Sequence, residues 1–366
     1  MVKSRVFAGL FLYFRFMEYF SKDLIDFASN DYLGFSKNNV FLDTTNLDLV
    51  CAISIDNGEI ELENHIANFH QVESASIFNS VYEATLCFFD SIPQKEDLIF
   101  YDELCHASIC SAIQVSNAFS CQFQHNDFED LERLIENSRL KTQYPKPIFI
   151  VTESVFSMDG DMPNLEELAQ LSEKYNCLLV IDESHSVGVF GENGQGLVQN
   201  FQLQNNVFAR IISFGNALSC SGSAIIGSKN LKKKLDNFDS RSINKIKLSP
   251  KAIANIVAAY KHLESEKQTI EQLRENLVYF NQEINLLGLK PMFVRSKSAI
   301  HSAIINRNYN VKFLADQFHK KGFIVKTILS PDVPEGQERL QFCLHSFNTK
   351  EEISILLGLL SKLVFG

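Results

Sequence analysis

Residues 148–188 read IFIVTESVFSMDGDMPNLEELAQLSEKYNCLLVIDESHSVG, and this stretch decides the fold class. It contains two short, continuously apolar runs, 148–151 and 178–181, which have the composition of strands buried on both faces. Between them, Asn164 is followed three residues later by a glutamate, which is the pattern of a helix N-cap, so we expect a helix that runs to about Tyr175. Continuously apolar strands separated by a helix indicate an α/β fold with a parallel sheet.

The rest of the chain divides into regions that differ in the pattern of their apolar residues. Apolar runs at 211–212 and 224–226 continue the strand pattern of the parallel sheet. In the last third of the chain, apolar residues recur at helical spacing up to Gly288 and again near the end, with strand candidates at 303–305 and 340–342 between them. The sequence therefore predicts an N-terminal segment, 1–40, a large α/β domain, 41–250, and a small C-terminal α+β domain, 251–366.

Composition and charge narrow the classes of function. The chain has 366 residues, 45% of them hydrophobic, and a net charge of −10 without a block of like charges, which suits a soluble protein and disfavours a nucleic-acid partner. No run is long and apolar enough to span a bilayer, and we expect residues 1–14 to form an amphipathic docking helix. Eight scattered cysteines without a CxxC pair indicate reduced thiols and a cytoplasmic location.

One small cluster has residue types that can bind metals. Cys105, His106 and Cys110 lie close together in the sequence, but their spacing fits no strong zinc pattern, so we expect ordinary buried thiols and no metal site. A thiol-protease dyad of Cys105 and His106 is a poor alternative, because sequence neighbours rarely form one.

Polar side chains follow both strands of the opening stretch, at the strand ends where ligands bind in open parallel sheets. Residues 152–161 come after the first strand, and residues 182–188 come after the second. Asp182, which closes its strand, and His185 can place a carboxylate and an imidazole in one cleft. On its own, this Asp-x-x-His spacing fits a structural turn as well as it fits a ligand site.

Taken together, the motifs resemble those of the α-oxoamine synthases, enzymes that depend on pyridoxal 5′-phosphate (PLP). Residues 152–161 and 182–188 match the family's T-E-x-V-F-S-M-D-G-D and D-[DE]-x-H-x-x-G motifs almost residue for residue, and residues 213–218, SFGNAL, resemble its cofactor-lysine segment. The resemblance implies PLP fold type I, with a mainly parallel seven-stranded sheet in the large domain. Within the family, the 8-amino-7-oxononanoate synthases of biotin biosynthesis look most similar. Shorter matches extend the resemblance over about residues 26–360, at 26–34, 102–108, 125–127, 191–196 and 333–340.

The resemblance also implies roles for individual residues. Asp182 is expected to pair with the protonated pyridine nitrogen of PLP, His185 to hydrogen-bond the ring phenolate oxygen, and His106 to stack on the ring. The family's active site forms between two subunits, so a homodimer that acts on an amino acid and an acyl thioester is implied. Further cofactor contacts are expected from Ser80, Val81, Tyr82, Ser157, Ser213 and Lys247, and substrate contacts from Asn30, Arg339 and Gln341.

The chain departs from the family pattern at several of these positions. Asn216 stands where the family has the catalytic lysine that forms a Schiff base with PLP, and a carboxamide nitrogen is not nucleophilic. Gln341 replaces an arginine, which removes a charge and the bidentate fork that binds a carboxylate. Val81 replaces a glycine of the phosphate-binding turn. Lys245 and Lys247 add positive charge where the family binds phosphate from the neighbouring subunit, although ordinary surface lysines explain them as well.

Three functions stay open at this point. The first is the family's reaction, a decarboxylative condensation of L-alanine with a pimeloyl thioester, which the loss of a positioned acid–base group slows by about 10²–10⁴-fold unless another lysine substitutes. The second is a catalytically degenerate homologue, a binding or scaffold protein that holds PLP non-covalently or not at all. The third, a nucleotide-binding α/β protein, is poorly supported, because the chain has neither GxGxxG after its first strand nor GxxxxGK[ST].

Overall fold

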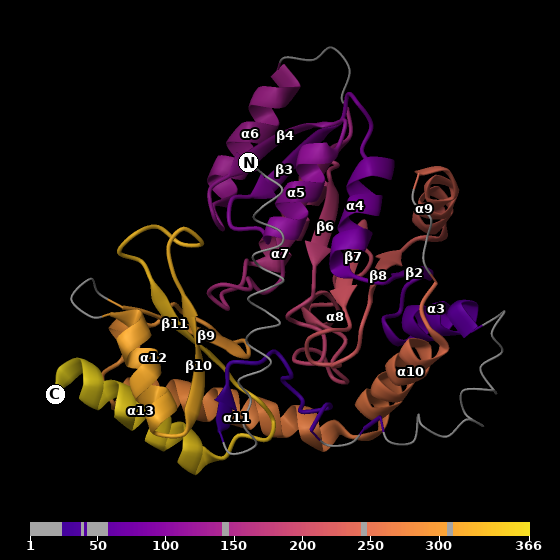
Figure 1. Cartoon of the computed structure of the whole chain (residues 1–366). Coiled ribbons are helices and arrows are strands. Elements are labelled where there is room, and N and C mark those ends of the chain that lie inside the picture. Colours follow the sequence, from indigo (N-terminus) through magenta and orange to yellow (C-terminus); the bar gives the residue numbers. More distant parts are fainter. Residues whose placement is uncertain (1–23, 38–39, 42–57, 141–145, 243–246, 306–309) are drawn as a thin grey trace.

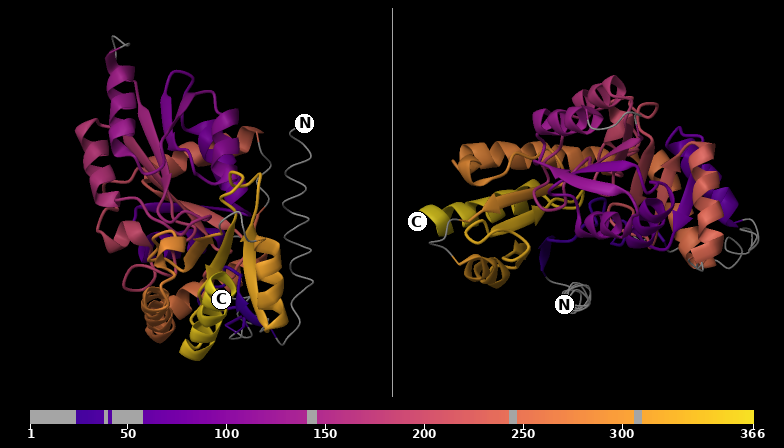
Figure 2. Two further views of the ribbon diagram at one scale, coloured as in Figure 1. Left: turned by 90° about the vertical axis from the view of Figure 1, so that its left-hand side faces the viewer. Right: turned by 90° about the horizontal axis from the view of Figure 1, so that it is seen from above.

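The protein contains two β-sheets with helices packed around them (Figure 1). The structure, a computed structural model, describes residues 24–37, 40–41, 58–140, 146–242, 247–305 and 310–366. Figure 2 shows from two further sides that the small sheet and the C-terminal helices form a lobe beside the large sheet. The expected α/β fold with a large and a small sheet is confirmed. The expected docking helix at residues 1–14 and Lys245 lie outside the described residues.

The large sheet has seven strands in the order β2-β8-β7-β6-β5-β3-β4, and it is parallel except for β8. Residues 224–226, which the sequence pattern grouped with the parallel strands, lie in β8 and run antiparallel to both neighbours. The reason is that only residues 214–222 connect β7 to β8, whereas a parallel crossover needs a longer connection, usually a helix. The strands are β2 Ser74–Phe78, β3 Leu98–Asp102, β4 Phe119–Phe123, β5 Ile148–Glu153, β6 Leu178–Asp182, β7 Ala209–Ser213 and β8 Ser223–Gly227.

The central strands are apolar throughout because both faces of the large sheet are covered. In β5, Phe149 and Val151 pack into one core cluster with α4, α5 and α9, while Ile148 and Ile150 pack into another with α6, α7 and α8. Asn164 caps α7 as expected, since its side chain accepts the Glu167 N–H at 3.3 Å. These helices are α4 Val81–Ser91, α5 Ala107–Val115, α6 Phe128–Leu140, α7 Leu165–Lys174, α8 Leu197–Asn200 and α9 Lys229–Ser242.

The small sheet has four strands in the order β1-β10-β11-β9, of which β1 and β10 are parallel and the others antiparallel. Its strand β1 comes from near the start of the chain, so both ends of the sequence contribute to this lobe. The domain boundaries expected from the sequence stay a prediction. The strands are β1 Ile25–Phe27, β9 Ile300–Ile304, β10 Phe323–Ile328 and β11 Arg339–Cys343, and the remaining helices are α3 Gly58–Phe69, α10 Pro250–Ser265, α11 Lys267–Leu286, η2 Lys290–Met292, α12 Val311–Lys320 and α13 Lys350–Phe365.

The loop that follows β5 fixes the small sheet against the large one. Gly160 lies in this loop at φ +74°, and a Cβ added there would stand 2.0 Å from the carbonyl oxygen of Ile300 in β9. The hydroxyls of Ser296 and Ser298 both donate to the carbonyl oxygen of Gly160, at 2.8 and 2.9 Å. Only glycine tolerates this approach without strain, so the loop brings the carboxyl ends of the large-sheet strands close to the small sheet.

The helices of the small lobe follow the periodicity of the sequence. The helix expected to stop at Gly288 is α11, and Gly288 adopts φ +68°, a conformation that ends helices. Thr349 opens α13 with a capping box, in which its hydroxyl accepts the Glu352 N–H and the Glu352 carboxylate accepts the Thr349 N–H. Within the described part of the chain, no helix is both long enough and apolar enough to cross a membrane.

Candidate active site

The carboxyl end of β6 places a buried carboxylate at the centre of the site. Asp182 is the last residue of β6, and its Oδ1 accepts the backbone N–H of Ser184 at 2.7 Å. Burial raises the pKa of Asp182 to about 6, although hydrogen bonds from Ser184 act in the other direction. The position therefore suits a ligand that brings a positive charge to the carboxylate.

His185 is partly buried, and two neighbouring side chains contact its Nδ1 atom. The hydroxyl of Tyr32 lies 2.8 Å from His185 Nδ1, and the side-chain amide nitrogen of Asn216 lies 3.4 Å from the same atom. Burial, then the nearby charges of His106 and Lys326, lower the pKa of His185 to about 3, while burial raises the pKa of Tyr32 well above its usual value. The Tyr32 hydroxyl can donate or accept, but the Asn216 amide nitrogen can only donate, so the Asn216 contact favours an accepting Nδ1 and a neutral ring with its proton on Nε2.

Asn216 lies beside His185, at the position expected for the cofactor lysine. Its Nδ2 donates to the carbonyl oxygen of Ser184 at 2.6 Å, and its Oδ1 accepts from Asn30 Nδ2 at 3.5 Å. Asn30 in turn accepts a weak contact from the thiol of Cys343 in β11, at 3.7 Å. The structure thus brings Asn216, His185 and Asn30 together, and it links them to the small sheet.

His106 lies at the start of α5, and its backbone N–H donates to Glu153 Oε1 at 2.5 Å. Its ring Nδ1 lies 2.8 Å from the hydroxyl of Ser108. The residue is exposed to solvent in the single chain, and partial desolvation by the surrounding protein, followed by the charge of Lys326, lowers the pKa of His106. We call Asp182, His185, His106 and Asn216 the large-sheet side of the site.

The small sheet supplies the opposite side of the site. Gln341 in β11 donates from Nε2 to the carbonyl oxygens of Ser157 and Met158, at 2.9 and 2.8 Å. In the next strand, β10, Lys326 is the direct antiparallel partner of Gln341. We call Lys326, Gln341 and Cys343 the small-sheet side.

Two residues expected to take part have other partners. Arg339 forms a buried ion pair with Asp159, and its Nε donates to the carbonyl oxygen of Gln337 at 3.1 Å. Its guanidinium is therefore occupied by an internal carboxylate. Ser157 meets Gln341 through its backbone carbonyl.

The residues expected to bind phosphate lie along the same edge of the large sheet. Phe78, Ser223 and Ser213 form one row across β2, β8 and β7, so Ser213 and the start of α4 share the edge that carries Asp182. Ser80 caps α4 by accepting the Glu83 N–H at 3.1 Å, and the first backbone N–H groups of a helix are free to bind an anion. Val81 and Tyr82 are the first residues of this helix, whereas Lys247 is exposed just before α10.

Two of the residues that shape the site were not expected from the sequence. Tyr32 lies inside a quoted motif, so its position near the site could have been inferred, but its contact with His185 could not. No motif contains Lys326, and only the pairing of β10 with β11 brings it opposite Gln341. A local sequence pattern carries no signal for such a cross-strand neighbour.

A third histidine at the same edge of the large sheet has a structural environment. His125 lies between two carboxylates, with Nδ1 2.8 Å from Asp102 and Nε2 2.8 Å from Asp161. Burial acts to lower its pKa, but the hydrogen bonds to Asp102 and Asp161 outweigh it and raise the pKa to about 10. Both ring nitrogens are engaged, so this charged cluster ties the end of β3 to the loop after β5. The described residues include no group of three His, Cys, Asp or Glu side chains placed to hold a metal ion.

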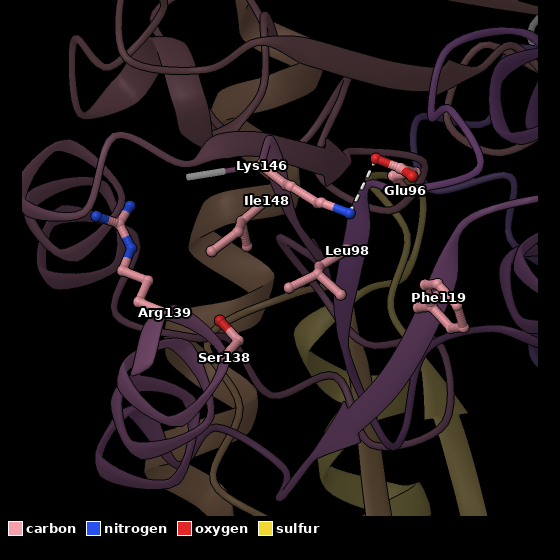
Figure 3. Close-up of a pocket in the computed structure, with 7 residues that line it drawn as sticks. All are labelled: Glu96, Leu98, Phe119, Ser138, Arg139, Lys146 and Ile148. Carbon is pink, nitrogen blue, oxygen red and sulfur yellow. Dashed lines mark ion pairs between the residues drawn. The ribbon is translucent and has the colours of Figure 1, made fainter. Parts of the chain in front are cut away.

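The cavity in Figure 3 lies away from this site. Its volume is about 140 Å³, and its lining includes Leu98, Phe119 and Ile148, the first residues of β3, β4 and β5. Lys146 and Glu96, at its mouth, form an ion pair of 2.9 Å. It is therefore at the amino edge of the parallel strands, opposite the edge where such sheets bind ligands.

Comparisons with known proteins agree with this geometry. The family profile described as aminotransferase class I and II matches residues 22–359. An 8-amino-7-oxononanoate synthase from Emericella nidulans is 34% identical over 311 residues, which cover 81% of this chain and 75% of that protein. The 8-amino-7-oxononanoate synthase 1 of Bacillus subtilis is 29% identical over 93% of this chain and 88% of that protein.

Solved structures show the same fold. The crystal structure of 8-amino-7-oxononanoate synthase from Francisella tularensis has a TM-score of 0.80 at 27% identity, covering 94% of this chain and 98% of that one. A serine palmitoyltransferase from S. paucimobilis, solved with PLP bound, has a TM-score of 0.82 at 20% identity, covering 93% of this chain and 87% of that one.

Proposed function

Because the chain belongs to the aminotransferase class I and II family, among its α-oxoamine synthases, we propose that it is a PLP-dependent acyltransferase that holds PLP without a covalent bond at position 216. The reaction would be the decarboxylative condensation of L-alanine with a pimeloyl thioester, as in 8-amino-7-oxononanoate synthases. The observation that carries the proposal is Asp182, a buried carboxylate that is costly to ionise until a positive charge meets it.

The described residues fit PLP at this edge of the sheet. Asp182 would hold the ring nitrogen in its protonated form, and His185, whose proton lies on Nε2, would donate to the ring oxygen. His106 would lie against the ring, and the start of α4, from Ser80 to Tyr82, would bind the phosphate. Ser157 and Ser213 would complete the cofactor contacts, with substrate contacts from Asn30.

PLP, when bound, supplies an electron sink for the electron pair released at the α-carbon of the amino acid. The chain's own residues then have three tasks, namely to keep the ring nitrogen protonated, to orient the ring and to move the α-proton. Asp182 and His185 are placed for the first two. Asn216 cannot take the third, because its amide neither accepts a proton near neutral pH nor acts as a nucleophile. The α-proton would therefore pass to water, and turnover would be about 10²–10⁴-fold slower than with a positioned base.

The contacts of Asn216 favour a second candidate, a catalytically degenerate homologue that binds PLP without turnover. The amide of Asn216 is already hydrogen-bonded to Ser184 and lies beside His185, so the site is ordered around an asparagine. This candidate keeps the cofactor contacts and loses the proton transfer. Assaying L-alanine with a pimeloyl thioester separates the two candidates, because only the first releases carbon dioxide and product.

The proposal includes a homodimer in the cytoplasm. The scattered cysteines suit a reducing compartment. Lys247 is exposed in the single chain, where it would be available to the phosphate of a neighbouring subunit.

The test compares the protein with Asn216→Lys after incubation with PLP and reduction by borohydride. We expect the unchanged protein to bind PLP by calorimetry without a covalent adduct at residue 216, and Asn216→Lys to carry one PLP on residue 216 by peptide mapping. Asn206→Lys, which adds a lysine at an exposed position, is the control and should gain no adduct. If neither the unchanged protein nor Asn216→Lys binds PLP, the proposal is wrong.

A further inference from the structure

Lys326 lies on the face of β10 that is turned to the site. It is the direct antiparallel partner of Gln341, and directly opposed residues in such a pair place their side chains on the same face of the sheet. Gln341 reaches the loop after β5 on that face, through its bonds to Ser157 and Met158. Cys343, two residues further along β11, shares the face and contacts Asn30. The Lys326 side chain therefore starts toward Asn30 and the large-sheet side.

The charge of Lys326 contributes to the pKa shifts of residues from three separate parts of the chain. It contributes to the lowered pKa values of His106 and His185, after the larger effect of burial, and it opposes the effect of burial on the pKa of Cys343. These residues lie at the start of α5, after β6 and in β11. Lys326 is half-buried on the face of β10 that is turned to the site, and none of the described carboxylates forms an ion pair with it.

The neighbours of Lys326 on the small-sheet side are not available to an anionic ligand. Gln341 has used its amide nitrogen on two backbone carbonyls, and its remaining atom, Oε1, is a buried acceptor without a hydrogen-bond partner. Arg339 is paired with Asp159. Of the described cations on the small-sheet strand β10 and its neighbour β11, Lys326 is the one left to bind a negative group.

We propose that Lys326 binds the carboxylate of the amino-acid substrate, a task that Gln341 cannot perform. The inference rests on the proposed function, since it assumes an amino acid held against PLP at the large-sheet side. In this arrangement the ammonium of Lys326 donates to the substrate carboxylate, and the free Oε1 of Gln341 accepts a further N–H of the same ammonium. The charge lost at position 341 is thereby supplied from the adjacent strand.

The test uses two stable probes, phosphopyridoxyl-L-alanine and phosphopyridoxyl-ethylamine, which differ only in the carboxylate. Calorimetry should give the unchanged protein a roughly tenfold preference for the alanine conjugate, as expected for a charge-assisted hydrogen bond. Lys326→Gln should lose that preference and bind the ethylamine conjugate as before, and Lys326→Arg should restore it. Lys320→Gln, an exposed lysine at the end of α12, is the matched control and should behave like the unchanged protein.

Three results would overturn the inference. The first is an undiminished preference for the alanine conjugate in Lys326→Gln. The second is an equal loss of both conjugates in that variant, which would mean that Lys326 acts on the phosphate or the ring. The third is a covalent PLP adduct on Lys326 after reduction with borohydride, which would make Lys326 the amine that holds the cofactor. If neither conjugate binds the unchanged protein, the proposed function fails and this inference fails with it, whereas binding of the ethylamine conjugate alone leaves the proposed function standing.

Discussion

The large-sheet side and the small-sheet side of the site differ in how their polar groups are satisfied. On the large-sheet side, Asp182 accepts a backbone N–H and His185 is hydrogen-bonded to the hydroxyl of Tyr32, so both are oriented before any ligand arrives. On the small-sheet side, Gln341 is bound to backbone carbonyls, while the side chain of Lys326 has neither a hydrogen bond nor an ion pair with another described residue. Under the proposed function, the large-sheet side would orient the ring and the small-sheet side would leave the charge of Lys326 available to a ligand.

The largest expected effect follows from removing the carboxylate of Asp182, on the large-sheet side. Asp182→Asn keeps the shape of the side chain but cannot carry the negative charge that a protonated ring nitrogen needs, so we expect PLP to bind roughly 100-fold more weakly. Calorimetric titration with PLP measures this loss. Asp236→Asn, at an exposed position near the middle of α9, is the control. Unchanged affinity for PLP in Asp182→Asn would contradict the role given to Asp182.

The same variant has a second, opposite effect on the stability of the protein without ligand. The pKa of Asp182 in the folded protein, about 6, is above its usual value of 3.8, so its contribution to stability is present below pH 4 and is lost as the pH rises through 6. The carboxamide introduced by Asp182→Asn does not titrate. We therefore expect this variant to gain stability relative to the unchanged protein between pH 4 and pH 7, by about 2–3 kcal/mol. Urea unfolding at both pH values measures the difference.

The rigidity of the large-sheet side is tested by the charged cluster at its edge. His125→Gln removes the cation between Asp102 and Asp161, and we expect a loss of about 2 kcal/mol in unfolding free energy near pH 6, because water screens part of the interaction. The pKa of His125 is raised from 6.5 to about 10, so its stabilisation is complete below pH 6.5 and fades as the pH approaches 10.

The control for this prediction is His319→Gln, on the exposed surface of α12. It should leave the unfolding free energy unchanged at every pH. A penalty for His125→Gln that stays constant from pH 6 to pH 10 would mean that the imidazole packs there as a neutral group, and the cluster would not be a charged tie.

The sequence predicted the parts of the fold that depend on local patterns. The runs at 148–151 and 178–181, each buried on two faces, and the N-cap at Asn164 lie where the sequence indicated. The direction of β8 was wrong, because the apolar run at 224–226 is the same for a parallel and an antiparallel strand. What sets its direction is the short connection from β7, which an apolar pattern does not register.

The candidate site was predictable to a similar extent. Asp182 and His185 follow one strand, and the strand pattern is sufficient to bring them to a common edge of the sheet. The expected positions of Asn216 and Asn30 depended on the resemblance, and in the structure Asn216 contacts His185 while Asn30 contacts Asn216. Lys326 could not be predicted, because its relation to the site depends on the register between β10 and β11, and a shift of one residue would turn it to the other face.

The link between the two sides is tested by Gln341. In Gln341→Met, a side chain of similar size loses both hydrogen bonds to the loop after β5, and the carbonyl oxygen of Ser157 is left without its partner. We expect a loss of about 1–2 kcal/mol in unfolding free energy, measured by urea unfolding. Gln170→Met, on the exposed face of α7, should cost nothing measurable. Equal stability of Gln341→Met and the unchanged protein would show that these bonds do not hold the two sides together.

The smallest expected effect concerns the proton on His185. Tyr32→Phe removes the hydroxyl that lies 2.8 Å from Nδ1, and Asn216, at 3.4 Å, remains as a weaker donor to the same atom. We expect the ring to lose part of its preference for the proton on Nε2, which ¹⁵N NMR of the His185 imidazole reports directly, and PLP to bind about fivefold more weakly. Tyr279→Phe, whose hydroxyl pairs with Ser354 far along the chain, removes a comparable bond without touching His185. If Tyr32→Phe leaves the ¹⁵N spectrum unchanged, then Asn216 alone sets the tautomer. The asparagine would then be an ordering element of the large-sheet side, and Asn216→Lys would disturb His185 as well as adding an amine.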